Sequence, residues 1–252
     1  MPKKLNIGNE EVNPDRFKTF SELKQCLHAL DIKNFQSLFF IDFSKSNVSY
    51  NNHQNEDIEK NPYYQILKSL NTVIDDFDDD KIFPVYRFGD IRTKDKAVLP
   101  LNWPEKDTSQ WTDKDAEYNG FEAVIQAYKE AVTQVTFAGP TTLQPLIQKS
   151  IEYSQQNPGQ HILSFILCDG GMCKPITDAE WVRKACDYPI SFVIISLSQE
   201  YDASLKRIDD MKGRKFDNVN CVNYPSLQKT LSKRIRQELK NMGKHTNEAI
   251  GK

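Results

Sequence analysis

Short apolar runs alternate with amphipathic helical segments along most of this chain, and this order constrains the fold more than any other feature. The strand-like runs cover residues 37–43, 81–90, 160–170, 189–198 and 218–224. Apolar residues recur at helical spacing over residues 61–77, 120–132, 141–156, 178–187 and roughly 225–240. Because the strand-like runs are continuously apolar, we expect helices on both faces of the sheet. The order predicts an α/β fold with a doubly wound, mostly parallel central sheet of about six strands, a Rossmann-like arrangement.

No linker rich in glycine, serine or proline divides the chain, so we predict a single domain over residues 18–242. Residues 1–17 and 243–252 are predicted to be a flexible N-terminal segment and a flexible tail. Residues 91–118 are rich in charges, and we expect a short edge strand near residues 97–103. The acidic stretch at 75–81 lacks the spacing of a calcium-binding loop, so we interpret it as a solvated turn between a helix and a strand.

The composition is that of an ordinary globular protein, with 38% hydrophobic residues, 27% charged residues and a formal net charge of −2. It provides no basic surface of the kind that nucleic acid selects. We expect neither a secretory signal nor a transmembrane segment, because no apolar run approaches the ~20 residues that a membrane span needs. The five cysteines are odd in number and far apart, which indicates a reduced, cytoplasmic protein. The basic residues after Ser232 leave weak peripheral membrane association open.

Oxygen-bearing side chains gather where the predicted elements begin or end. Asp42, Ser44 and Ser46 stand at alternate positions at the end of the first apolar run, and Asp169 ends a later one. Thr141 and its neighbour Thr142 precede the third helix, which they are also predicted to cap.

The carboxyl ends of parallel strands meet at one edge of a sheet, so these side chains are expected to converge there. Two carboxylates and three hydroxyls form a mostly neutral set of hard oxygen ligands that suits Mg²⁺ or Mn²⁺, and Ca²⁺ less well. Each segment alone also fits a turn in which Asp and Ser bond their own backbone. Their combination and order favour a metal site.

The chain resembles von Willebrand factor type A domains that carry a metal-ion-dependent adhesion site (MIDAS), and more closely the copine family. The matching segments include FIDFSKSN, NPYYQILKSLNTVIDDFDDDKIFPVYRFGD, FAGPTTLQPLI and ILCDG, in family order from about residue 18 to residue 230. The first and last parts look most like the copine domain of plant RING-type ubiquitin ligases.

The resemblance implies a Mg²⁺- or Mn²⁺-dependent protein-interaction module whose metal ligands are Asp42, Ser44, Ser46, Thr141 and Asp169. Copine domains often have threonine where Ser44 stands, and serine keeps the hydroxyl. No paired Cys-x-x-Cys follows Tyr224, so we do not expect a RING or ubiquitin ligase activity. The few residues before Phe17 are too short for the lipid-binding modules that copines usually carry.

Three functions compete. In the first, the metal accepts an acidic side chain from a partner protein, and Asn47, Tyr50, Asp90 and Met172 are candidate specificity residues. The second is a metal-dependent phosphohydrolase, but none of the four histidines is a convincing base. The third is a vestigial scaffold without metal. We predict the first, an interaction module that is not an enzyme.

Overall fold

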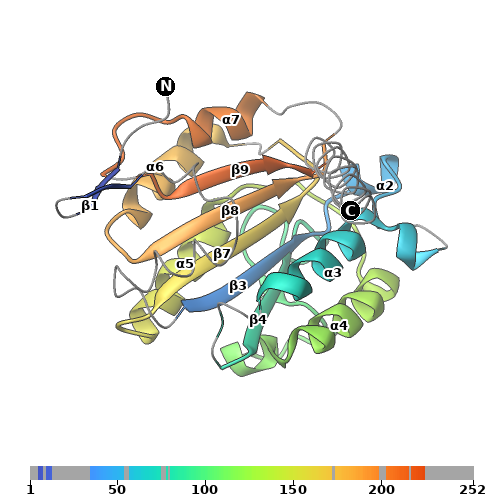
Figure 1. Cartoon of the computed structure of the whole chain (residues 1–252). Coiled ribbons are helices and arrows are strands. Elements are labelled where there is room, and N and C mark those ends of the chain that lie inside the picture. The colour runs from blue at the N-terminus through green and yellow to red at the C-terminus, as the bar shows by residue number, and fades with distance from the viewer. Residues whose placement is uncertain are drawn as a thin grey trace, which may run out of the picture.

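The computed structural model of the chain describes residues 5–7, 10–12, 35–53, 57–74, 78, 80–171, 174–198, 203–215 and 217–224. Its elements after the N-terminal segment are β3 (Phe35–Asp42), α2 (Ser46–Ser49), α3 (Pro62–Ile74), β4 (Ile82–Phe88), β5 (Leu99–Pro100), β6 (Glu117–Asn119), α4 (Phe121–Gln134), α5 (Gln144–Gln156), β7 (His161–Cys168), α6 (Pro175–Ala185), β8 (Ile190–Ser196), α7 (Ala203–Asp209) and β9 (Val219–Asn223). Short 3₁₀ helices lie at Ile58–Lys60 and Asp113–Ala116. Figure 1 shows these elements arranged around one twisted sheet.

The central sheet has seven strands within the described residues, in the order β5-β4-β3-β7-β8-β9, with β6 also paired to β4. The five strands from β4 to β9 run parallel to one another. The short strands β5 and β6 pair with β4 in the antiparallel direction. The predicted mostly parallel, doubly wound sheet is therefore confirmed, and β5 is the edge strand expected near residues 97–103.

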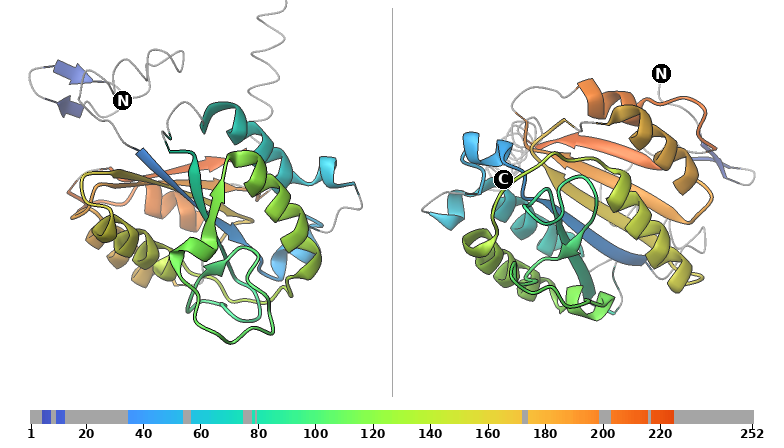
Figure 2. Two further views of the ribbon diagram at one scale, coloured as in Figure 1. Left: turned by 90° about the horizontal axis from the view of Figure 1, so that it is seen from below. Right: turned by 180° about the vertical axis from the view of Figure 1, so that it is seen from behind.

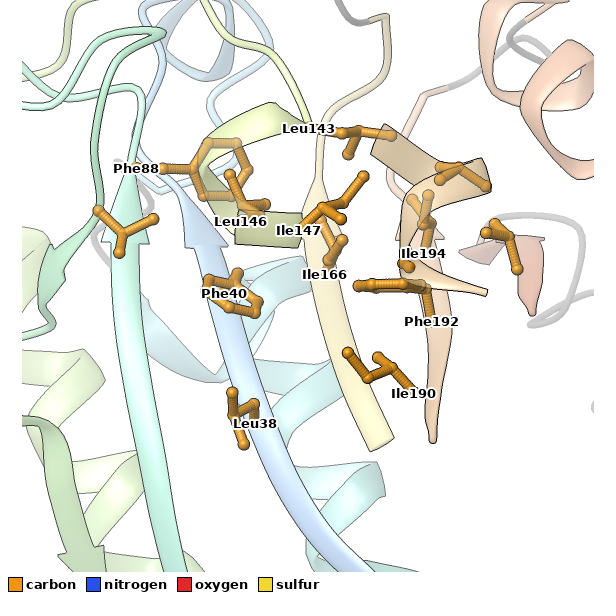
Figure 3. Close-up of a cluster of buried hydrophobic side chains, with 14 of the residues drawn as sticks. Leu38, Phe40, Phe88, Leu143, Leu146, Ile147, Ile166, Ile190, Phe192 and Ile194 are labelled. Carbon is orange, nitrogen blue, oxygen red and sulfur yellow. The ribbon is translucent and has the colours of Figure 1, made fainter. Parts of the chain in front are cut away.

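Two layers of helices cover the two faces of the sheet, as the views in Figures 1 and 2 show. Helices α3 and α4 pack on one face, and α5, α6 and α7 pack on the other. Successive residues of β3 explain why both faces need covering: Phe39 belongs to the first core and Phe40 to the second, and both are fully buried. Figure 3 shows the second core, where Phe40 lies near Ile166 and Leu146.

Several boundaries differ from the sequence prediction. Helix α5 begins at Gln144 with Leu143 as its N-cap residue and no side-chain cap, so the threonine caps predicted at 141 and 142 are wrong. Residues 5–7 and 10–12, inside the predicted N-terminal segment, form the antiparallel hairpin of β1 (Leu5–Ile7) and β2 (Glu10–Val12). The helix predicted at 225–240 and the tail at 243–252 lie outside the described residues.

The interpretation of residues 75–81 as a solvated turn is wrong at Asp78. This side chain is only 1% exposed, and its Oδ2 accepts a hydrogen bond of 2.9 Å from the backbone N–H of Ser37. Asp78 therefore supports the start of β3, whereas Asp80 and Lys81 are exposed as expected. Burial raises the pKa of Asp78 to about 7.

The topology sets the place of any ligand. After β3 the chain adds β4 on one side, and it later adds β7, β8 and β9 on the other. The point where the strand order reverses therefore lies between β3 and β7. In open α/β sheets, ligands bind outside the carboxyl ends of the strands at such a point. Asp42 ends β3, and Asp169 directly follows β7.

Candidate metal centre

Asp42 lies at the carboxyl end of the central strand β3 and is almost completely buried, with 1% of its surface exposed. Its Oδ1 accepts a hydrogen bond of 2.8 Å from the backbone N–H of Ser44. This local turn holds the carboxylate in place over the end of the strand. The turn expected as an alternative to metal binding is thus present, but it uses only one of the two carboxylate oxygens.

Gly89 shows that three loops converge on Asp42. A Cβ atom added at residue 89 would lie 2.8 Å from Oδ1 of Asp42, 2.8 Å from Cγ2 of Thr141 and 3.0 Å from the backbone N of Ser44. These three atoms therefore surround a single point beside the end of β4. The φ angle of Gly89 is +77°, in the left-handed region that favours glycine. The chain needs glycine here both for its backbone conformation and for the approach of its neighbours.

The other two predicted ligands extend this group. Ser46 begins α2, is exposed, and places its Oγ 3.0 Å from Oγ of Ser44. Asp169 follows β7, and the pairing of Ile41 with Leu167 puts it beyond the same edge of the sheet as Asp42. The structure therefore brings all five residues, Asp42, Ser44, Ser46, Thr141 and Asp169, to one end of the sheet.

The electrostatics of Asp42 are those of a carboxylate that lacks a counter-charge. Burial, and then the charge of Asp169, raise the pKa of Asp42 from 3.8 to about 8, although hydrogen bonds from Ser44 oppose the shift. Among the described residues, Oδ2 of Asp42 is buried without a hydrogen-bond partner. A bound proton or a cation would relieve both conditions. The residues therefore fit a divalent cation with hard oxygen ligands.

The described part of the chain contains no cluster of three or more His, Cys, Asp or Glu side chains that could hold a metal ion. The five residues here include only two carboxylates and three hydroxyls, so such a site would differ from a carboxylate-rich one. Hydroxyl oxygens are nevertheless normal ligands for hard cations.

Asn47 supports the loop from beneath. Its side chain is fully buried, and its Nδ2 donates to Oγ of Ser44 at 3.2 Å. Its Oδ1 accepts hydrogen bonds from the hydroxyl of Tyr63 at 2.9 Å and from Nδ2 of Asn52 at 3.1 Å. The prediction of Asn47 as a specificity residue is therefore wrong, because this amide holds Ser44 in place and cannot reach a partner.

His53 lies in a polar stretch of sequence, yet only 2% of it is exposed. Its Nε2 donates to the carbonyl oxygen of Asp42 at 2.7 Å, and its Nδ1 lies 2.8 Å from the hydroxyl of Tyr128. The ring stacks between Phe43 and Tyr63, at centroid distances of 4.7 and 4.0 Å. Burial lowers the pKa of His53 to about 3, so the ring is neutral and acts as a fixed support for the end of β3.

Asp90 is the second candidate specificity residue that the structure contradicts. It is fully buried, and its Oδ2 pairs with Nε of Arg87 at 2.5 Å. Its Oδ1 accepts hydrogen bonds from the backbone N–H groups of Arg92 and Thr93, both at 2.8 Å. Both oxygens of this carboxylate are thus occupied by contacts that stabilise the loop after β4. Tyr50 is exposed, so its role as a specificity residue stays a prediction, and Met172 lies outside the described residues.

Thr142 has a different role from its neighbour. It is fully buried, and its hydroxyl donates to Oδ1 of Asp178 on α6. The same oxygen accepts the backbone N–H of Gln144 at 3.0 Å. Asp178 thereby anchors the loop that presents Thr141, a link between separate segments that local sequence patterns do not reveal.

Comparison with solved structures identifies proteins of similar fold. The structure titled "von Willebrand factor type A from Catenulispora acidiphila" matches 82% of this chain and 42% of its own chain, with 15% identity and a TM-score of 0.48. The structure of manganese-loaded Plasmodium vivax TRAP protein matches 78% of this chain and 71% of its own, with 13% identity and a TM-score of 0.50. The expected doubly wound α/β fold is confirmed.

The family is also established. Residues 52–242 match the family model described as Copine, and the chain belongs to the copine family. "E3 ubiquitin-protein ligase RGLG5" of Arabidopsis thaliana is 27% identical over 246 residues, covering 90% of this chain and 54% of that protein. "Copine family protein 2" of Caenorhabditis elegans is 27% identical over 229 residues, covering 87% of this chain and 3% of that protein. The chain thus spans about half of the ligase and a small part of the worm protein.

Proposed function

We propose that this chain is a divalent-metal-dependent protein-interaction module that acts in the cytoplasm. Asp42, Ser44, Ser46, Thr141 and Asp169 would hold Mg²⁺ or Mn²⁺ as a metal-ion-dependent adhesion site. The observation that carries the proposal is the convergence of Asp42, Ser44 and Thr141 around Gly89, with one buried carboxylate oxygen of Asp42 lacking a hydrogen-bond partner among the described residues. The copine family match and the manganese-loaded protein of similar fold support it.

The charge count suggests what such a site would bind. When bound, the ion would supply a positively charged coordination position for an acidic side chain of a partner. The protein contributes at most two negative charges, those of Asp42 and Asp169. These do not exceed the charge of a divalent cation, so the site carries no net negative charge that would repel a carboxylate from a partner. The three hydroxyls add oxygen atoms without adding charge.

Thermal unfolding tests the metal site. The full chain and its Asp42→Asn variant are heated in chelator and in added Mg²⁺, Mn²⁺ or Ca²⁺. An ion at a hundredfold excess over its dissociation constant should stabilise the wild type by about 2.7 kcal/mol. For a protein of this size that is a rise in Tm of roughly 5–10 °C.

The variant should lose this rise. Asp209→Asn serves as the matched control, because burial also raises the pKa of Asp209, yet its carboxylate accepts the backbone N–H of Cys221 on β9. This control should respond to metal as the wild type does. No rise in the wild type up to millimolar metal would favour a vestigial scaffold and refute the site.

We further propose that the chain is not an enzyme. The described histidines are poorly placed as bases: His53 is neutral beneath the site, and His161 begins β7 at the opposite edge, where its Nε2 lies 3.0 Å from Oγ of Ser191. Incubation with Mn²⁺ and p-nitrophenyl phosphate should give no hydrolysis above that of Asp42→Asn. Turnover that this variant abolishes would instead establish a phosphohydrolase.

A further inference from the structure

The exposed large apolar side chains are concentrated at one end of the molecule. Among the described residues they are Val48, Tyr50, Ile91 and Ile176, with exposed fractions of 36%, 67%, 49% and 79%. Val48 and Tyr50 follow β3, Ile91 follows β4, and Ile176 lies two residues into α6, after β7. These are the loops that follow the strands around Asp42 and Asp169. We call these four residues the apolar rim.

Hydrogen bonds and an ion pair hold these loops together. The backbone N–H of Lys45 donates to the carbonyl of Ala138 at 2.6 Å, and that of Ile91 donates to the carbonyl of Thr136 at 3.0 Å. The segment that leads to Thr141 therefore lies against both the β3 and the β4 loops. Nζ of Lys174 pairs with Asp95 at 2.7 Å, which joins the loop after β7 to the loop after β4. The loops that carry the rim residues are thus linked to one another around the candidate metal centre.

The charged residues of these loops indicate the charge that a partner should carry. Lys45 and Lys94 are exposed on the β3 and β4 loops. The two acidic residues of the β4 loop are already engaged, since Asp90 pairs with Arg87 and Asp95 pairs with Lys174. The loop after β3, over residues 43–53, contains no acidic residue. Exposed lysines and a bound cation would together favour an acidic partner.

We propose that the apolar rim and the metal centre together recognise an acidic segment of a partner protein in which aliphatic or aromatic residues flank the acidic one. This inference rests on the proposed function: the acidic side chain binds at the metal, and its apolar neighbours contact Val48, Tyr50, Ile91 and Ile176. Isolated exposed apolar residues are common on protein surfaces, but a group that surrounds a polar site is typical of an interface. The partner is thereby defined by its mixed acidic and apolar character.

The experiment uses a displayed library of random twelve-residue peptides, selected on the full chain in Mn²⁺ and, separately, in chelator. Peptides enriched only in Mn²⁺ are synthesised, and their affinities are measured by fluorescence anisotropy. We expect them to carry Asp or Glu next to aliphatic or aromatic residues. The double variant Tyr50→Ser/Ile176→Ser should bind them at least about 10-fold more weakly, which corresponds to about 1.4 kcal/mol.

The control double variant is Lys114→Ser/Glu122→Ser, two exposed residues remote from these loops. It should bind the peptides as the wild type does. The rim variant should keep the full Mn²⁺-dependent rise in Tm, which separates partner recognition from metal binding. Sedimentation of the same proteins tests whether the rim instead joins two copies of the chain.

Each other outcome overturns the inference. Enriched peptides that are acidic without apolar neighbours, no enriched peptide, or a rim variant that binds within twofold of the wild type would all contradict the role of the rim. A dimer that the rim variant abolishes would identify the rim as a self-association surface. An absent Mn²⁺ response in the wild type would instead refute the proposed function, and the rim inference with it.

Discussion

Replacing Gly89 with alanine tests the geometry on which the metal centre depends. The new methyl group would meet Oδ1 of Asp42 and Cγ2 of Thr141 at 2.8 Å, and the backbone N of Ser44 at 3.0 Å. Real Cβ atoms hardly ever approach other heavy atoms so closely, so at least one of the three loops must move. Because the loop after β3 and the loop that contains Thr141 both carry predicted ligands, the substitution should damage metal binding as well as stability.

The magnitude has two parts. Alanine at the φ of +77° found for Gly89 costs about 1–2 kcal/mol, and forcing a methyl group into a filled space costs a further 1–3 kcal/mol, roughly. Gly159 separates them, because its φ is +87° while no heavy atom would lie within 4 Å of an added Cβ. Gly159→Ala should therefore show only the backbone cost. We expect Gly89→Ala to be about 1–3 kcal/mol less stable than this control.

Urea unfolding of both variants and the wild type measures these free energies, first in chelator and then in Mg²⁺. Gly159→Ala should keep the whole stabilisation by metal, and Gly89→Ala should lose most of it. Equal stabilities for the two variants, together with an intact metal response in Gly89→Ala, would refute the convergence of Asp42, Ser44 and Thr141 at this point.

Three further predictions follow from the buried polar groups. Burial raises the pKa values of Asp42 and Asp78 above their unfolded values, so the stability that these two carboxyls contribute should fall as pH rises from about 4 to about 8, whereas the lowered pKa of His53 acts in the opposite sense below about pH 6.5. Urea unfolding of the wild type and Asp42→Asn in chelator isolates the share of Asp42: the stability of the wild type relative to the variant should decrease over this pH range. Asn47→Ala removes the amide that joins Ser44 to Tyr63, which should cost about 1–3 kcal/mol and weaken Mg²⁺ binding in a calorimetric titration; unchanged affinity would contradict its positioning role. Arg87→Met leaves Asp90 buried without its cation, which should lower the free energy of unfolding by about 3–5 kcal/mol. The double variant Arg87→Met/Asp90→Asn should recover part of that loss in a double-mutant cycle.

The apolar pattern was sufficient to predict the sheet and most of its helices. Residues 37–43 form a buried strand because both faces of β3 pack on helices. A continuously apolar run is the pattern that such two-sided burial predicts. Pro62 begins α3 as its fixed φ favours. The convergence of Asp42, Ser44 and Thr141 followed from one physical rule, that the ends of parallel strands meet at the same edge.

The residues beneath the site could not be predicted in the same way. Asn47, Asn52 and His53 occur in a polar stretch that reads as a solvated loop, yet Asn47 and His53 are buried by contacts with residues such as Tyr63 and Tyr128 far along the chain. Burial of these polar side chains depends on such long-range partners, and contacts of this kind produce no periodic pattern in the neighbouring sequence. Asp90 was misjudged for a different reason: its partner Arg87 is only three residues away, but the sequence does not show that this arginine is buried at the end of β4.

The two short strands beside β4 have a consequence for how other proteins can approach. Residues Ile82–Pro84 pair with β6, and Tyr86 and Arg87 pair with β5, so most of the outer edge of β4 already has main-chain partners. At the opposite edge, the N–H of Cys221 on β9 donates to Asp209. A partner therefore gains little by adding its own strand beside β4, and the same arrangement protects this edge against edge-to-edge aggregation.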